Sequence, residues 1–212
     1  FDILHSHGAY YYNSFVGPLA RLCNMKSLVK TSMANNDLAR LDKKLSGRVH
    51  CFFLKQVHAY IAISRELQHE LKELNFPDSK VHCMPNGVDT ARFKPLFKND
   101  QAQQKINLLS IVHERPVALS VGVFDKRKNI GWLIDQWIEH QGFRTGAILL
   151  AVGPQSREDE DGLFLQNLLK KASEFPELVM VVKHVEEIEK YFQAADFFIL
   201  PSECCFPLFA LR

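Results

Sequence analysis

Short apolar runs alternate with amphipathic segments along most of the chain, and this alternation constrains the fold more than any other feature of the sequence. The most regular amphipathic segment spans residues 130–138, where large apolar side chains recur at helical spacing. Alternation of this kind predicts parallel β-sheets covered by helices, that is, an α/β fold. We expect strands at residues 2–7, 27–33, 60–63, 81–84, 117–121, 147–152, 178–182 and 197–200.

Local signals refine this scheme. Residues 2–7 read as a buried strand, and Gly8 predicts a sharp turn directly after it. Ser64 is a candidate N-cap for the helix that follows it. We expect the Ser46-Gly47 pair to interrupt a stretch of helical spacing, and the Asn86-Gly87 pair to form a turn because glycine tolerates positive φ.

The composition argues against several classes of protein. A hydrophobic fraction of 47% with 24% charged residues is typical of a globular chain. The 26 basic and 24 acidic side chains give a net charge of +2, which does not indicate a nucleic-acid partner. No apolar run approaches the roughly 18 residues of a membrane-spanning helix, and no signal-peptide pattern is present. The 5 cysteines show no paired zinc spacing, so we expect reduced thiols, a cytoplasmic location and no metal site.

Two stretches carry side chains that suit a binding site. His5 and His7 end the first predicted strand, and functional residues of α/β folds collect at the carboxyl ends of strands. Lys126, Arg127 and Lys128 lie between a predicted strand end and a helix start, where amide groups and the helix dipole favour anions. This arrangement favours a phosphate site, although it lacks the glycines of a Walker A loop. The alternative interpretations are a loop-capping histidine and a solvated basic loop.

Several motifs resemble one family. The string PNGVD at residues 85–89, followed by RF and a proline at 95, resembles the hinge of the retaining GT-B glycosyltransferases known as family 4. The segment SVGVFDKRKNIGWLIDQW at 120–137 is similar to the first strand, loop and helix of that family's donor domain. Residues 147–154 and 181–203 resemble later donor-domain segments, and LHSHG at 4–8 resembles a strand end of the acceptor-side domain.

This resemblance implies an architecture and an activity. It implies two Rossmann-like parallel-sheet domains, both incomplete: residues 1–90 would form part of the acceptor-side domain, and residues 91–212 part of the donor-binding domain. The chain would thus be truncated at both ends. The implied activity is transfer of a hexosyl group, with retention, from a nucleotide-sugar donor to an unknown sugar or lipid acceptor. No cofactor or catalytic metal is expected, and contact with a membrane surface is possible.

The resemblance also implies site residues. His7 matches the histidine that lines the cleft near the reacting sugar and is the expected catalytic residue. Lys128 matches the lysine that contacts the donor diphosphate, with Arg127 assisting, and Val185 matches a residue near the base. Glu203 can serve as an acidic residue near the sugar only if its loop slips by one position. The expected donor-binding residues are Gly8, Arg127, Lys128, Val185 and Glu203.

The sequence also departs from the family pattern. Val123 stands where many members have an arginine, and Cys204 and Arg212 align with the two family glutamates. These departures favour an alternative, in which the chain is a truncated or degenerate GT-B module that binds nucleotide weakly and transfers nothing. A sugar-nucleotide epimerase of the same architecture fits the PNGVD hinge less well.

Overall fold

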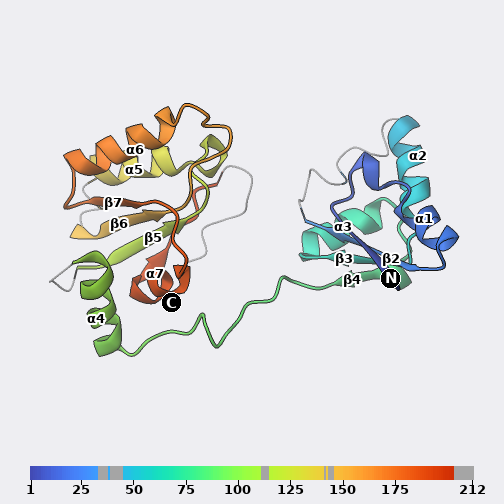
Figure 1. Cartoon of the computed structure of the whole chain (residues 1–212), viewed down its shortest axis with the longest axis horizontal. Helices are drawn as coiled ribbons and strands as arrows, with labels where there is room; N and C mark the ends of the chain where they lie inside the picture. Colours follow the sequence, from blue (N-terminus) through green and yellow to red (C-terminus); the bar gives the residue numbers. More distant parts are fainter. Residues whose placement is uncertain (33–37, 39–44, 111–114, 141, 143–145, 203–212) are drawn as a thin grey trace. The chain divides into compact units, whose positions relative to one another are not determined.

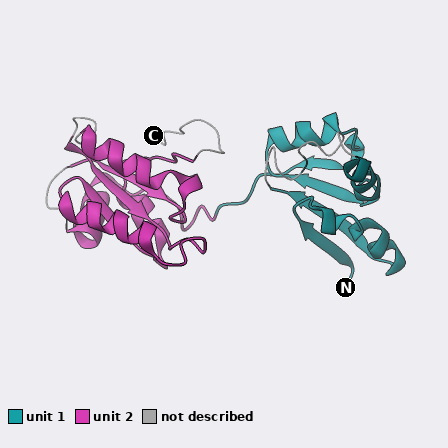
Figure 2. Ribbon diagram, turned by 90° about the horizontal axis from the view of Figure 1, so that it is seen from above, with its two compact units in different colours: residues 1–88 teal, residues 89–212 magenta. Residues whose placement is uncertain are grey.

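The computed structural model describes residues 1–32, 38, 45–110, 115–140, 142 and 146–202. The chain divides into two compact units, Phe1–Val88 and Asp89–Arg212, which are coloured separately in Figure 2. Among the described residues, no helix is long and apolar enough to cross a membrane.

Unit 1 is built on a sheet in the order β1-β2-β3-β4, in which every pair of neighbouring strands is parallel. Its strands are β1 (Ile3–His7), β2 (Lys26–Thr31), β3 (Ala59–Ala62) and β4 (Val81–Cys83). Its helices are α1 (Val16–Leu22), α2 (Leu45–Leu54) and α3 (Arg65–Glu73), with 3-10 turns at Tyr11–Asn13 and Asp78–Lys80. The core contains Val29, Leu54, Val57, Tyr60, Leu67 and Leu71.

Unit 2 is built on a second sheet, in the order β7-β6-β5-β8, and its strand pairs are also parallel. Its strands are β5 (Val117–Val121), β6 (Ile148–Val152), β7 (Val179–Val182) and β8 (Phe197–Phe198). Its helices are α4 (Lys98–Leu109), α5 (Ile130–Glu139), α6 (Leu163–Glu174) and α7 (Ile188–Ala194), with a 3-10 turn at Lys126–Lys128.

Helices cover both faces of the unit 2 sheet, with α5 and α6 on one face and α4 and α7 on the other (Figure 1). Alternate strand residues face opposite layers, as the pleat of a strand requires. Ala118 and Leu149 pack in the cluster that includes α5 and α6, whereas Leu119 and Leu150 pack in the cluster that includes α4 and α7. The predicted α/β fold with two parallel sheets is confirmed.

Two helix predictions are also confirmed. The Ser64 side chain accepts a hydrogen bond from the amide of Leu67 at 3.3 Å, so Ser64 is the N-cap of α3. The stripe predicted for residues 130–138 faces the core of unit 2: Ile130, Ile134 and Trp137 are buried.

Three local predictions are wrong. Strand β1 is not buried, since it alternates exposed and half-buried residues and, among the described residues, pairs with β2 on one side only. Ser46 and Gly47 do not interrupt a helix but lie inside α2, because Gly47 is on its buried face and packing outweighs a helix-propensity cost of about 1 kcal/mol. Gly87 has no positive φ. The turn lies further on, where the Phe93 amide donates to the Asp89 carbonyl at 2.8 Å.

Candidate functional site

The loop between β5 and α5 carries the predicted diphosphate-binding residues, and it is held to the neighbouring strand. The Gly122 amide donates to the Val152 carbonyl at 3.0 Å, and the Phe124 amide donates to the Pro154 carbonyl at 2.9 Å. The Phe124 side chain is fully buried and anchors the loop in the core. Because the loop is fixed at both positions, the basic 3-10 turn that follows has a defined place at the end of the sheet.

Asp125 organises this basic turn. Its Oδ1 accepts from the Lys128 amide at 2.8 Å, which caps the turn, and its Oδ2 lies 3.6 Å from Arg127 Nη2. Asn129 then adopts a left-handed conformation with φ of 54°, after which α5 begins. Among the described residues, no side chain caps the first amides of α5. These amides are therefore available to an anion.

Lys128 is the basic residue of this turn that best suits binding of an anion together with the α5 amides. Its side chain is half-buried, and its Cγ, Cδ and Cε would lie 3.7–3.9 Å from a Cβ placed on Gly122, so it passes across the end of β5. It forms no ion pair within the part of the chain that the structure describes. Arg127, by contrast, is partly neutralised by Asp125. The loop thus presents a half-buried lysine without an ion-pair partner among the described residues, two positions before the start of α5.

Gly153 is a residue of this region that the sequence analysis did not single out. A Cβ at Gly153 would lie 1.8 Å from the Gly122 carbonyl oxygen, so no other residue fits without a backbone shift. The signal available in the sequence was the Val-Gly pair that ends each of two apolar runs, at residues 121–122 and 152–153. The backbone at the end of β6 thus packs directly against the backbone at the end of β5, where the basic loop begins.

The remaining predicted donor-binding residues of unit 2 follow other strands of the same sheet. Val185 lies three positions after the end of β7, is half-buried and packs in the cluster that contains Leu119 and Val152. Ser202, which follows β8, is buried, and its hydroxyl donates to the Arg127 carbonyl at 3.4 Å. Glu203 lies outside the described residues. All these segments leave carboxyl ends of parallel strands and so emerge at one edge of the sheet.

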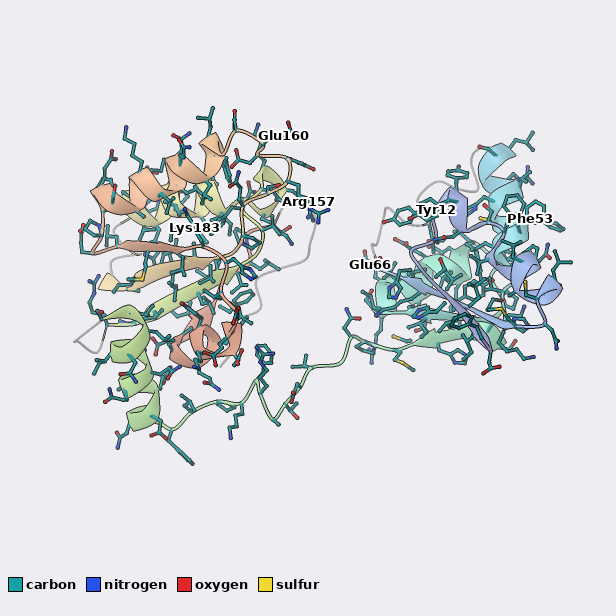
Figure 3. All side chains as sticks on the ribbon, viewed as in Figure 1. Tyr12, Phe53, Glu66, Arg157, Glu160 and Lys183 are labelled. Carbon is teal, nitrogen blue, oxygen red and sulfur yellow. The ribbon has the colours of Figure 1, made fainter. Side chains whose placement is uncertain are left out.

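A pocket of about 420 Å³ lies beside the same loop but has a different character. It is lined by Phe124 and Lys126 on one side and by residues of the β6–α6 loop on the other. Its carboxylates are those of Asp125, Glu158, Asp159 and Asp161. Such a negative lining repels a diphosphate, so this pocket does not suit the predicted anion. Arg157 projects from the same β6–α6 loop (Figure 3).

In unit 1, His7 lies at the carboxyl end of β1, directly opposite Lys30 in the register with β2. Its ring is stacked at a tilt on that of His5, with ring centres 4.5 Å apart. Burial lowers the pKa of His5, and the charges of His7 and Lys30 lower it further. Lys30 Nζ donates to Asn86 Oδ1 at 2.7 Å, which ties the segment after β4 to the end of β2.

The turn after His7 requires glycine. Gly8 has φ of +78° and its amide donates to the Lys30 carbonyl at 2.7 Å. A Cβ at this position would lie 2.3 Å from the Tyr10 ring. The sharp turn predicted at Gly8 is therefore present. Across the described residues of both units, no group of three or more His, Cys, Asp or Glu side chains is arranged to hold a metal ion.

Both halves of the sequence are similar to glycosyltransferases. Residues 1–92 match the family described as Glycosyltransferase Family 4, and residues 115–212 match the one described as Glycosyl transferases group 1. The chain is 26% identical over 163 residues to the alpha-monoglucosyldiacylglycerol synthase of Acholeplasma laidlawii, a match that covers 76% of this chain and 39% of the synthase. It is 27% identical over 130 residues to the putative glycosyltransferase EpsF of Bacillus subtilis, covering 60% and 32% of the two chains.

The fold is similar to that of solved glycosyltransferases. Anabaena HepE, crystallised in complex with UDP, superposes with a TM-score of 0.69 at 14% identity, over 95% of this chain and 53% of that one. Sucrose-phosphate synthase from Thermosynechococcus elongatus gives a TM-score of 0.67 at 20% identity, over 95% and 50%. The chain thus spans about half of each solved structure and less than half of each curated relative.

Proposed function

Because the chain belongs to the family 4 glycosyltransferases with the GT-B fold, we propose that it takes part in transfer of a hexosyl group from a nucleotide sugar, with retention of configuration. One observation carries this proposal. At the carboxyl end of β5, the Lys128 side chain passes Gly122 without an ion-pair partner among the described residues, and α5, which begins two residues later, has no side-chain cap at its N-terminus. A nucleoside diphosphate is the leaving group that such an arrangement stabilises.

In the proposed reaction, Lys128 and the α5 amides hold the diphosphate while negative charge develops on it, and Arg127 assists. No metal is needed in this scheme, because fixed protein charges replace it. His7 and Gly8 lie near the transferred sugar, Val185 near the base and Glu203 near the sugar. The position of these residues after parallel strands supports their assignment, since ligands of α/β sheets bind at carboxyl ends.

Relatives suggest the substrates. The solved structures of Anabaena HepE contain UDP and UDP-glucose, which makes UDP the first nucleotide to test here. The Acholeplasma synthase is named for a monoglucosyl diacylglycerol, which supports a lipid acceptor and peripheral contact with a membrane surface. We also propose a cytoplasmic location, which the free thiols of Cys23, Cys51 and Cys83 support.

The test is calorimetric titration of the full chain with UDP, GDP and ADP. We expect one nucleotide to bind, and Lys128→Ala to weaken its affinity by about 10- to 100-fold, as loss of a charged hydrogen bond predicts. Lys126→Ala is the matched control, because Lys126 is exposed in the same turn and should leave the affinity nearly unchanged. Absence of binding to all three by a folded sample would favour the degenerate module instead.

A further inference from the structure

Three consecutive backbone carbonyls form the turn that follows β1, and all three are held by side chains from outside it. The carbonyls of His7 and Gly8 accept hydrogen bonds from Asn13 Nδ2 at 3.2 and 2.8 Å. The carbonyl of Ala9 accepts from His50 Nε2 at 2.8 Å. Two side chains therefore fix the peptide groups on both sides of Gly8, the residue at which the backbone turns.

Asn13 is itself held in place. It ends the 3-10 turn Tyr11–Asn13, its side chain is buried, and its amide donates to the Tyr10 carbonyl at 2.8 Å. Tyr12, an exposed residue of this turn, is labelled in Figure 3. The Asn13 carboxamide can make both bonds because its NH2 group carries two hydrogens. An aspartate at this position would have no hydrogen to donate. The side chain at the end of the loop from His7 to Asn13 is thus hydrogen-bonded to the backbone at its start.

His50 reaches the turn from a separate helix, α2. It is 2% exposed, and its Nδ1 contacts the Ser14 hydroxyl while its Nε2 faces Ala9. Nε2 must carry a hydrogen to donate to a carbonyl, so Nδ1 of the neutral ring can only accept. The single hydrogen of the Ser14 hydroxyl is shared between Nδ1 and the Tyr11 carbonyl, which lies 2.6 Å from the hydroxyl oxygen. Both ring nitrogens therefore have partners, and the imidazole orientation is fixed.

We propose that Asn13 and His50 are positioning residues for His7: by holding the carbonyls on both sides of Gly8, they set the direction in which the His7 imidazole leaves β1. This inference rests on the proposed role of His7 near the transferred sugar. In the described part of the chain, residues 8–10 lie in no strand or helix, and the Gly8 amide donates to the Lys30 carbonyl. The φ of +78° at Gly8 is one of several conformations open to glycine. The two side chains select among them.

The experiment follows the turn by NMR in the full chain without nucleotide, using the hydrogen-exchange rate of the Gly8 amide and the imidazole signals of His7. Asn13→Ala removes two of the three bonds and His50→Leu removes the third. We expect each to raise the Gly8 exchange rate about tenfold or more, relative to that of the Tyr60 amide, and to shift the His7 signals. His50→Gln keeps an N–H donor for Ala9 and should restore both readings.

Leu71→Ala in α3 is the matched control, because it opens a cavity in the same core and lowers stability without touching the turn. We expect it to leave the His7 signals in place. Unchanged His7 signals in folded Asn13→Ala, or equal effects of His50→Gln and His50→Leu, would overturn the proposal. If Asn13→Ala does not fold, the comparison of His50→Leu with His50→Gln tests the proposal by itself. Nucleotide titration reports on Lys128 in the other unit, so a failure of the proposed function is seen separately.

Discussion

Gly153 illustrates how one residue can decide whether two strand ends meet. The Gly122 carbonyl occupies the space that a side chain at Gly153 would need, and it is backbone, which cannot rotate away. Glycine is therefore required here for space and not for a positive φ, which Gly153 does not have.

We expect Gly153→Ala to lower the free energy of unfolding of unit 2 by about 3 kcal/mol, at the upper end of the usual cost of overpacking. Urea denaturation followed by tryptophan fluorescence measures this, because Trp132 and Trp137 both lie in unit 2. Gly131→Ala is the control. Its Cβ would make only ordinary contacts of 3.5–3.7 Å, and alanine in α5 should raise stability by roughly 0.5 kcal/mol. Equal effects of the two substitutions would contradict the steric explanation.

His50 makes the stability of unit 1 depend on pH. Burial lowers the pKa of its imidazole, and the hydrogen bond to the Ala9 carbonyl opposes this only in part. The folded-state pKa is thus below the ordinary value of 6.5, and the unfolded chain binds more protons near that pH. The contribution of neutral His50 is complete above pH 6.5 and is lost as the pH falls through the folded-state pKa.

We therefore expect the free energy of unfolding of unit 1 to fall between pH 7.5 and 5.5, and the fall to be smaller in His50→Gln. Urea titration followed by the ring signals of Tyr60 measures it, since Tyr60 is buried in this unit. The comparison with His50→Gln separates His50 from His5 and His58, whose pKa values are also lowered by burial. An identical pH dependence in both proteins would exclude His50 as the source.

Arg92 and Phe93, which follow the PNGVD string in the motif, both contact helix α7. Arg92 Nη2 lies 2.7 Å from Glu189 Oε2, and this bond lowers the pKa of the Glu189 carboxyl. The Phe93 ring packs edge-on against Phe192, with centres 5.8 Å apart. The arginine and the phenylalanine of the motif thus dock the segment after the hinge onto α7, within unit 2.

We expect Phe93→Ala to release this segment, because aromatic pairs contribute about 0.5–1.5 kcal/mol beyond their buried area. Limited digestion with trypsin should then cut after Arg92 about 3- to 10-fold faster, as measured by mass spectrometry of the fragments; Lys94 precedes a proline and is not cut. Phe97→Ala is the control, since Phe97 is 85% exposed in the same stretch. A cleavage rate that Phe93→Ala leaves unchanged would show that the ring pair does not hold the segment.

The two units have separate apolar cores, and each unit is built on a parallel sheet. The apolar cluster of unit 1 and the two clusters of unit 2 share no residue. In each unit, every paired strand is parallel, so the residues that follow the strands emerge at one edge of the sheet. His7 and Lys30 lie at or near the last positions of their strands in unit 1, and Lys128 and Val185 follow strands in unit 2. Parallel topology is therefore what gathers residues distant in sequence.

Local sequence patterns predicted the α/β class and most of the strands and helices, and motifs predicted Lys128 and His7 as site residues. These follow from local periodicity and from motifs, which depend only on neighbouring residues. The residues that support these elements and predicted site residues are set by tertiary contacts. The contacts of Gly153 with Gly122, and of His50 with Ala9, join segments that lie far apart along the chain. The exposure of β1 and the continuity of α2 through Gly47 have the same origin, because burial depends on which elements pack together.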